Sequence, residues 1–539
     1  MKTPCFLIIL VLFFSVNAAF SQLSWSRVWD QRYGGNAGDY LMSYKTAPHH
    51  GFILAGKTFS DSSGNKTTPH FSPGAADYWI VRVDSLGNKL WEKDFGASGD
   101  DQMTFIDRTA DGGYILGGSS GSAAGGDKSQ NTQGGLDYWI IKTDSGGTIQ
   151  WEKDFGGTDD DNLYSVQQTF DGGYLLCGDS RSGVGGDKTF GHYGAADFWI
   201  VKTDSLGVKQ WDKVFGGSAY ERFMAMKKTS DGGFLLGGAT QSGVSGNKTT
   251  TGRGFIDNWI IKIDSAGNKL WEKDFGGSGD DYLTAIGQGA DGGYLLGGWS
   301  TSGISGDKTQ PSRGHDDLWI LKTDSLGTKL WDKDFGGTAN EDEFTSIYPT
   351  PDGGYLLGAT SYSNAGGDKT DDNLGVEQPW LIRIDSLGTK LWDKTVFTTG
   401  HNEAGFAMEA GDNKCYIVLT ADNGVTGGDK TQDAWNNSSD LWIVKYCQGK
   451  STGTEADETA LGTLKVFPNP FKNQIHVGWY SDSPLPFRTY VSLYDVYGKK
   501  ILTQDLNGEI TLNTSGLSAG VYILEMKCGA IYRVEKLIK

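Results

Sequence analysis

A phrase of about 20 residues recurs along this chain and constrains its fold more than any other feature. The phrase reads Asp-x-Trp-Ile, then Lys-x-Asp-Ser-x-Gly, then a second Trp and Phe-Gly-Gly, with substitutions from copy to copy. Its first tryptophan recurs at separations of 60, 60, 60, 60, 61 and 62 residues, at Trp79, Trp139, Trp199, Trp259, Trp319, Trp380 and Trp442. A fixed period of this length indicates a repeat fold, in which each unit buries its apolar face against its neighbours.

Each unit contains four short β patterns. In the fifth unit they cover residues 282–289, 292–300, 317–324 and 329–337. Turn signals separate them: Asp-Gly-Gly, a Gly/Ser loop that contains Gly-Asp-Lys-Thr, and Asp-Ser-Leu-Gly. In the last of these turns we expect the Asp to accept backbone amides and the Gly to take a positive φ.

The two ends of the repeat region complement each other. The second tryptophan follows the first by twelve residues in every unit except the last, where Thr454 stands in its place. A spare copy, Trp29, lies near the N-terminus. The pattern therefore predicts an all-β fold, a closed seven-bladed β-propeller of four-stranded blades over residues 22–449, with the N-terminal strand closing the last blade. An open β-solenoid is the alternative, and it does not explain the spare and missing segments.

The first 21 residues predict export. Lys2 precedes an apolar run over residues 6–16, and a small-residue pattern ends at Ser21, which is typical of a signal peptide and too short for a membrane span. No later apolar run approaches about 20 residues, so we expect no transmembrane segment in the mature chain. Cys415 and Cys447 fall at neighbouring ends of two antiparallel strands of the last unit. Because an exported compartment permits oxidation, they predict a disulfide.

After a polar linker, residues 450–463, the repeat stops, and residues 464–539 carry about seven alternating β patterns that predict a small Ig-like β-sandwich. The motifs Phe-Pro-Asn-Pro (467–470), Leu-Tyr-Asp-Val-Tyr-Gly-Lys-Lys (493–500), Gly-Val-Tyr (520–522) and a basic end (536–539) stand in order. This segment resembles the type A C-terminal sorting domain of the type IX secretion system of Bacteroidota. The resemblance implies the type IX machinery as a partner, a secreted or surface location, and attachment at the outer-membrane surface. An accessory β-sandwich is the alternative.

The repeat units themselves are similar to tandem repeats of large secreted proteins of that phylum. This resemblance informs the architecture and not the chemistry.

The net charge of the chain limits the classes of partner that it can bind. The chain has 48 Lys and Arg against 66 Asp and Glu, a formal charge of -18. Such a chain repels polyanions, so we expect no nucleic-acid partner.

A first candidate site is a ring of carboxylates. Six residues past the aromatic residue of each Phe-Gly-Gly-like turn stand Asp39, Asp101, Asp161, Glu221, Asp281, Glu341 and Glu403. If the first strand of each unit lines the axis, these groups approach one mouth of the channel, where they could bind Ca²⁺ or a basic or polyhydroxylated ligand. The alternative is that each pairs within its own blade with a backbone amide or the repeat lysine.

A second candidate site lies in the loops that the units do not share, on the same face. These loops carry His192, Tyr193, Arg253, Arg313, His315 and Trp435. Aromatic and polar side chains on a rigid scaffold suit contact with a glycan or a surface protein. Drift in solvated loops is the alternative.

Catalytic signatures are sparse. The chain has no His-Glu-x-x-His, no phosphate loop and no Gly-x-Ser-x-Gly elbow with a placeable partner. We therefore expect a non-enzymatic binding or structural protein without a resident cofactor. A polysaccharide-active hydrolase or lyase is the alternative, and the nearest departures from the repeat that could serve it are Arg222, Asp371, Asp372 and Glu377.

Overall fold

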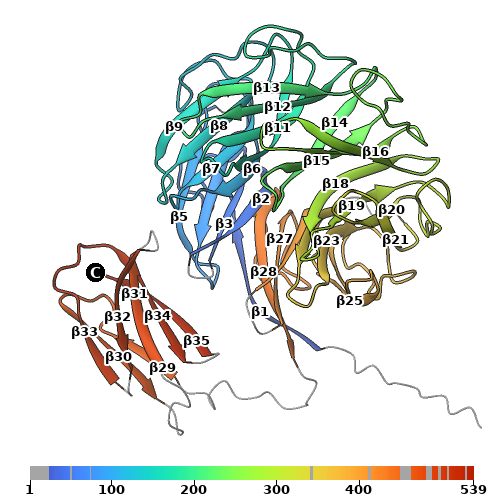
Figure 1. The fold of residues 1–539 in the computed structure, drawn as a ribbon. Helices are drawn as coiled ribbons and strands as arrows, with labels where there is room; N and C mark the ends of the chain where they lie inside the picture. The colour runs from blue at the N-terminus through green and yellow to red at the C-terminus, as the bar shows by residue number, and fades with distance from the viewer. Residues whose placement is uncertain are drawn as a thin grey trace, which may run out of the picture.

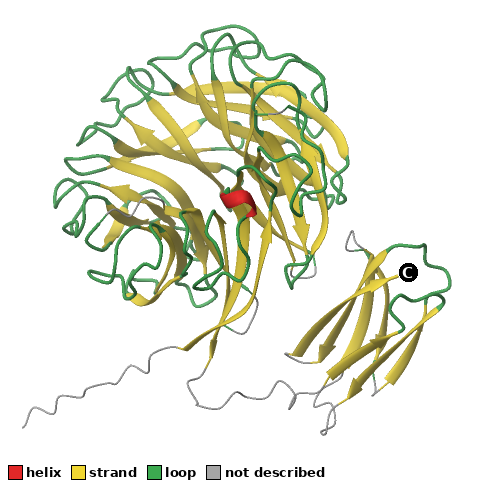
Figure 2. Ribbon diagram, turned by 180° about the vertical axis from the view of Figure 1, so that it is seen from behind, coloured by secondary structure: helices red, strands yellow, loops and turns green. Residues whose placement is uncertain are grey.

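The computed structural model describes residues 24–48, 51–72, 74–339, 344–410, 414–449, 463–480, 489–495, 499–506, 509–528 and 531–539. The expected signal peptide, residues 1–21, lies outside these ranges, as does the expected linker apart from Thr463. In the described ranges the regular structure is β, save for one short 3-10 turn, η1 (Trp435–Asn437) (Figure 2). No helix in these ranges is long and apolar enough to cross a membrane.

Residues 24–449 form seven four-stranded antiparallel sheets, one for each repeat unit. The first three contain β2 (Asp39–Ala47), β3 (Gly51–Thr58), β4 (Asp77–Val83) and β5 (Lys89–Phe95); β6 (Asp101–Arg108), β7 (Tyr114–Ser120), β8 (Asp137–Thr143) and β9 (Ile149–Phe155); and β10 (Asp161–Gln168), β11 (Tyr174–Ser180), β12 (Asp197–Thr203) and β13 (Lys209–Phe215).

The next three contain β14 (Glu221–Lys228), β15 (Phe234–Thr240), β16 (Asp257–Ile263) and β17 (Lys269–Phe275); β18 (Asp281–Gln288), β19 (Tyr294–Ser300), β20 (Asp317–Thr323) and β21 (Lys329–Phe335); and β22 (Phe344–Pro349), β23 (Tyr355–Ser361), β24 (Gln378–Ile384) and β25 (Lys390–Thr395). The seventh contains β26 (Asn402–Glu409), β27 (Cys415–Asp422), β28 (Asp440–Gly449) and, from the other end of the chain, β1 (Ser24–Tyr33).

One buried contact repeats in every sheet and explains the repeated tryptophan. The indole Nε1 on the third strand donates to a carboxylate on the fourth, at 2.9–3.2 Å. The same carboxylate accepts the backbone amide of the Thr or Ser that follows the repeat lysine, and so fixes the loop between strands two and three. We call these the anchoring carboxylates: Glu92, Glu152, Asp212, Glu272, Asp332, Asp393 and Asp30.

The seven sheets succeed one another around a common axis (Figure 1). The first strand of each sheet contacts the first strand of the next, and β2 of the first sheet contacts β26, β27 and β28 of the seventh. Neighbouring sheets share apolar cores; for example, Tyr78 of β4 packs against Trp139 of β8, and its hydroxyl donates to the Trp139 carbonyl at 3.1 Å. The architecture is therefore all-β and propeller-like.

The N-terminal strand completes the seventh sheet. β1 pairs antiparallel with β28, with Arg32 opposite Trp442. Asp30 is the anchoring carboxylate of this sheet: it accepts Trp442 Nε1 at 3.1 Å and both the amide and the hydroxyl of Thr431, at 2.9 and 2.8 Å. Trp29 lies over Gly87 of the first sheet, where a Cβ would approach the indole to 2.8 Å. The spare segment thus takes the place that the sequence left open.

The Asp-Ser-x-Gly turns behave as expected. Asp84 Oδ1 accepts the amides of Leu86 and Asn88, at 2.9 and 2.8 Å, and Gly87 has a φ of 77°. The equivalent aspartates accept the same two amides in the next five units.

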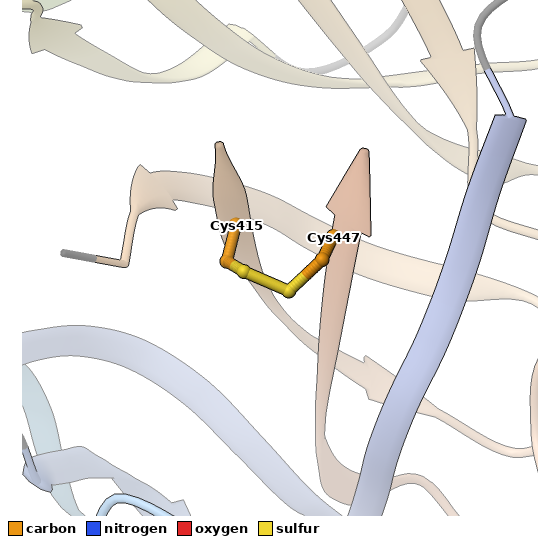
Figure 3. The surroundings of a disulfide bond; sticks show 2 residues. All are labelled: Cys415 and Cys447. Carbon is orange, nitrogen blue, oxygen red and sulfur yellow. A yellow bond between two sulfur atoms is a disulfide. The ribbon is translucent and has the colours of Figure 1, made fainter. Parts of the chain in front are cut away.

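Cys415 begins β27 and Cys447 lies opposite it on β28, and the structure joins them by a disulfide (Figure 3). The bond links β28, which pairs with β1, to β27 on its other side, so it reinforces the sheet that both ends of the repeat region build.

The C-terminal region forms two further sheets. One contains β29 (Thr463–Phe467), β30 (Gln474–Tyr480) and β33 (Glu509–Asn513); the other contains β31 (Thr489–Asp495), β32 (Lys500–Asp505), β34 (Val521–Cys528) and β35 (Ile531–Ile538). Side chains of both sheets share one apolar core, which includes Ile475, Leu493, Leu512 and Leu524.

The closure of the seventh sheet generates a prediction. We expect Asp30→Ala to lower the free energy of unfolding by about 3 kcal/mol, because it removes the acceptor of the buried Trp442 indole and of the Thr431 amide and hydroxyl. Glu272→Ala, which removes the same contacts from the fourth sheet, is the matched control. No turn connects β1 to its partner β28, whereas a short turn connects β17 to its partner β16. Limited proteolysis should therefore cut residues 24–33 in Asp30→Ala but should not release β17 in Glu272→Ala. Equal protection of β1 in both variants would contradict this account of closure.

Candidate functional site

The carboxylates proposed as a ring are buried within their own sheets. Asp39, Asp101, Asp161, Glu221 and Asp281 are each 0% exposed. Each accepts the amide of the residue four positions earlier, at 2.7–2.9 Å. Hydroxyl groups at the end of the second strand donate to the same carboxylates, as Thr58 and Ser60 do to Asp39. Each group therefore closes the loop between one sheet and the next.

The seventh position of this ring needs a correction. The register pairs Asn402 with Asp422, as it pairs Asp101 with Ser120, whereas Glu403 pairs with Ala421. The cause is a shift of the aromatic residue: Val396 occupies the place of Phe335, so a count that starts from Phe397 runs one residue too far. Asn402 donates to Thr398 Oγ1 at 2.6 Å. Glu341 and the side chain of Glu403 lie outside the described residues.

Burial raises the pKa of three of these carboxyl groups, Asp39, Asp101 and Asp161. It brings the pKa of Asp39 and of Asp161 to about 6, against the lowering effect of their hydroxyl and amide donors, and it raises that of Asp101. All five carboxylates accept a backbone amide close by in the chain, as the alternative of pairing within the blade predicted. A ligand role for these groups stays a prediction.

Four of the seven repeat lysines pair with a different carboxylate, at one equivalent position. Lys66, Lys128, Lys248 and Lys308 are nearly fully buried and form ion pairs with the aspartate two residues after the anchoring carboxylate: Asp94, Asp154, Asp274 and Asp334. In the seventh sheet this position is Arg32, and Lys430 pairs instead with Asp422. In the seventh sheet the lysine therefore keeps an ion pair, but its acid lies on the second strand of the sheet, β27, and not on the fourth.

Four candidate residues of the variable loops occupy one equivalent place. The backbone amides of Tyr193, Arg253, Arg313 and Trp435 each donate to the aspartate at the start of the third strand. Their side chains lie over the next sheet. Arg253 and Arg313 form ion pairs with Asp307 and Asp368 of the following lysine loops, at 3.0 and 2.8 Å.

The aromatic members of this set lie over the next lysine loop as well. A Cβ on Gly246 would approach the ring of Tyr193 to 2.9 Å, and one on Gly64 would approach Trp435 to 2.8 Å. Arg32 lies 4.1 Å from the centre of the Trp435 ring. These four residues therefore form seams between sheets, with Tyr193 still about half exposed.

The two histidines in these loops lie apart. His192 Nδ1 is 3.2 Å from the carbonyl of Ser182, and the exposed His315 lies beside Asp316. In the part of the chain that the structure describes, no group of three or more His, Cys, Asp or Glu side chains is arranged to hold a metal ion.

A different group of residues gathers where the repeat is broken. It lies at the ends of the inner strands of sheets three to five, and we call it the inner-strand cluster: Tyr164, Asp179, Tyr220, Arg222, Tyr282 and Trp299. The strands β10, β14 and β18 that carry half of it contact one another in series. Five of the six lie within two residues of the strand ends that face the variable loops, and Tyr164 is the fourth residue of β10, so the cluster lies toward the variable face.

The cluster combines a flat aromatic surface with charged groups. The rings of Tyr282 and Trp299 stack with centroids 4.2 Å apart and planes 24° from parallel, and both are partly exposed. Arg222 is exposed and interacts electrostatically with Tyr164, Tyr220 and Asp179.

Asp179 is the buried acid of the cluster. It is 1% exposed, accepts Asn162 Nδ2 at 3.2 Å through Oδ1, and has no hydrogen-bond partner at Oδ2. Burial raises its pKa to about 7, although Asn162 and Arg222 favour the charged form. Such a group changes charge near neutral pH.

A comparison of equivalent positions in the sequence could have found this cluster. The residues that take the place of Asp179 in the seven units are Lys57, Ser119, Asp179, Ala239, Trp299, Thr360 and Ala421. This position varies in charge and size inside an otherwise repeated strand, and only Arg222 of the cluster was noted as a departure from the repeat.

Comparison with known proteins places the C-terminal region. Residues 465–539 match the model of the family described as "Secretion system C-terminal sorting domain". The chain therefore carries a type IX sorting signal, as the motifs predicted, and is a secreted or cell-surface protein. No curated protein sequence matches the chain.

Several solved structures are similar to this chain at low identity and low TM-score. The polysaccharide lyase Uly1 is 12% identical over 78% of this chain and 92% of its own, with a TM-score of 0.40. A Synechocystis apocarotenoid oxygenase mutant is 13% identical over 74% of this chain and 88% of its own, with a TM-score of 0.38. A β-xylosidase/α-arabinofuranosidase from a compost metagenome is 14% identical over 55% and 94%, with a TM-score of 0.29. At these scores the likenesses carry no argument about activity.

The buried acids predict how stability depends on pH. Burial and a second carboxyl nearby outweigh the ion pairs with Lys128 and Lys308 and raise the pKa of Asp154 and Asp334 to about 8, against about 3.9 for an unfolded chain. Between these values the folded state binds more protons, so the free energy of unfolding falls as pH rises. We expect the urea midpoint to fall from pH 5.5 to 8.5, and to fall less in Asp154→Asn/Asp334→Asn. Asp159→Asn/Asp433→Asn removes two exposed charges and should keep the wild-type slope; an equal slope in the buried variant would contradict the prediction.

Proposed function

We propose that residues 22–449 form a closed seven-bladed β-propeller that acts outside the cell as a non-enzymatic binding module for a glycan. The seven sheets, the contacts of β2 with β26, β27 and β28, and the pairing of β1 with β28 support the closed ring. The signal peptide over residues 1–21 and the sorting domain, an Ig-like sandwich, direct export in a bacterium of the phylum Bacteroidota. Attachment at the outer-membrane surface follows transport.

The stacked pair of Tyr282 and Trp299 carries the proposal. Aromatic side chains on a rigid sheet present a flat apolar surface with polar edges, which suits the face of a sugar ring. This pair lies on strands β18 and β19, which are hydrogen-bonded to each other, so little freedom is lost when a ligand binds.

Polar groups lie beside the pair. Arg222, Tyr220 and Asn162 lie on or next to the neighbouring inner strands and can exchange hydrogen bonds with sugar hydroxyls. The seam residues Arg253 and Arg313, by contrast, are already engaged with the next sheet. A glycan therefore fits the inner-strand cluster better than the variable loops.

One observation favours catalysis as a second candidate. Asp179 has a raised pKa, an unpartnered oxygen and a nearby arginine and tyrosines, which are groups that a polysaccharide-active hydrolase or lyase employs. Its burial favours binding, because a catalytic acid has to reach the bond that it protonates.

The test is a glycan array probed with the full mature chain. We expect Trp299→Ala and Tyr282→Ala each to weaken binding by about tenfold or more, because each truncates an aromatic anchor. Phe190→Ala removes a ring of similar size that is 54% exposed on a variable loop, and should bind as wild type. The same glycans are incubated with the wild type and assayed for new reducing ends and unsaturated products.

Three results would decide between the candidates. Binding without turnover supports the module, and turnover that is lost in Asp179→Asn supports the enzyme. If no glycan binds, or if Phe190→Ala weakens binding as much as Trp299→Ala, the proposed function is wrong.

A further inference from the structure

We propose that the glycan bound at the inner-strand cluster is acidic, and that Arg222 binds a uronic acid carboxylate of the sugar that stacks on Tyr282 and Trp299. This inference rests on the proposed function and names the class of ligand for the same site.

Arg222 is the exposed cation of the cluster. Within the described ranges it forms no ion pair with a carboxylate, whereas its neighbour Arg181 lies 3.5 Å from Asp160. Tyrosine hydroxyls surround it instead, through its interactions with Tyr164 and Tyr220. A guanidinium held in this way keeps its charge and its planar donors for a ligand.

The position of Arg222 complements the aromatic pair. It is the second residue of β14, and Tyr282 is the second residue of β18, the next inner strand. The electrostatic interaction between Arg222 and Tyr282 places the two side chains in the same neighbourhood. A sugar ring on the aromatic pair can therefore direct a carboxylate toward the guanidinium, where a bidentate pair of hydrogen bonds can form.

The local charge differs from that of the whole chain. The formal charge of -18 argued against a polyanionic partner such as nucleic acid, but salt screens such a field within about 10 Å. Among the acids that act on the cluster, Asp179 and Asp161 are buried and Asp280 is partly exposed, whereas the cation Arg222 is exposed. A short acidic glycan therefore meets a positive group at its contact point.

Asp179 links binding to pH. The charged or titratable groups that act on it or that it acts on are Arg181, Arg222, Asp161, Tyr138, Tyr164 and Tyr220. When Asp179 is protonated, it is neutral and does not offset the attraction between Arg222 and a ligand carboxylate. When Asp179 ionises, its negative charge repels the bound carboxylate. Affinity for an acidic glycan should therefore fall as pH rises through about 7, because the pKa of Asp179 lies there; uronic acids stay ionised throughout.

The experiment compares matched ligands by isothermal titration calorimetry. The probes are oligogalacturonate and oligoglucuronate, each beside its methyl ester, which keeps the sugar and removes the charge. We expect the wild type to bind an acid at least tenfold more tightly than its ester, and Arg222→Gln to lose that preference. Arg253→Gln, an arginine already paired with Asp307, should keep it. Arg222→Lys should recover only part of it, because lysine lacks the planar fork.

The second readout is the pH profile. Wild-type affinity for the preferred acid should be several-fold higher at pH 5.5 than at pH 8.5, and Asp179→Asn should make it independent of pH. Thermal unfolding confirms that each variant is folded. If acid and ester bind equally well, the acidic-ligand inference is wrong while the glycan module stands. If neither binds and the array is also empty, both proposals fall; if Arg222→Gln keeps the preference, the role of Arg222 is wrong.

Discussion

The buried anchoring carboxylate is the interaction on which the rest of the repeat depends. It accepts the indole N–H of the third strand, and it also accepts the backbone amide of the residue that follows the repeat lysine. The tryptophan, the acid and the loop are thereby fixed to one another in every sheet, and the same contact made by Asp30 brings in the N-terminal strand. Because a buried carboxylate without donors is costly, the three parts are required together. This interdependence explains why the phrase recurs with so little change.

A rigid repeat leaves only certain positions free to vary. Positions that hold neighbouring sheets together are occupied, and this includes four loop residues that sequence alone marked for ligand contact: Tyr193, Arg253, Arg313 and Trp435. At the inner-strand ends, Arg222 is exposed and Tyr282 and Trp299 are partly exposed, so these side chains are under fewer such demands. Residues that break the repeat gather there, and the scaffold holds them in place without their own contribution to it. Function and architecture are thus carried by different positions of the same strands.

The sequence predicted the sheets well because their period and turns are local signals. The strand that completes the seventh sheet was also predictable, since one tryptophan was spare and one was missing. The sequence count assigned the seventh ring position to Glu403, whereas the register places Asn402 there. The count was one residue too long because Val396 takes a place that elsewhere belongs to an aromatic residue. The inner-strand cluster was not predicted as a group. Asp179, Arg222 and Trp299 lie in three different units, and only the packing of successive inner strands brings them together.

The strand that β1 requires as its partner is also the last strand before the sorting domain. The indole of Trp442 and the carboxylate of Asp30 are 412 positions apart in the chain, and contacts of such separation form late in folding because the intervening chain has to be ordered first. A polypeptide that is cut short before β28 lacks this contact, and it lacks residues 465–539 as well. Because β28 precedes residues 465–539, any chain long enough to carry the sorting domain also carries the strand with which β1 pairs.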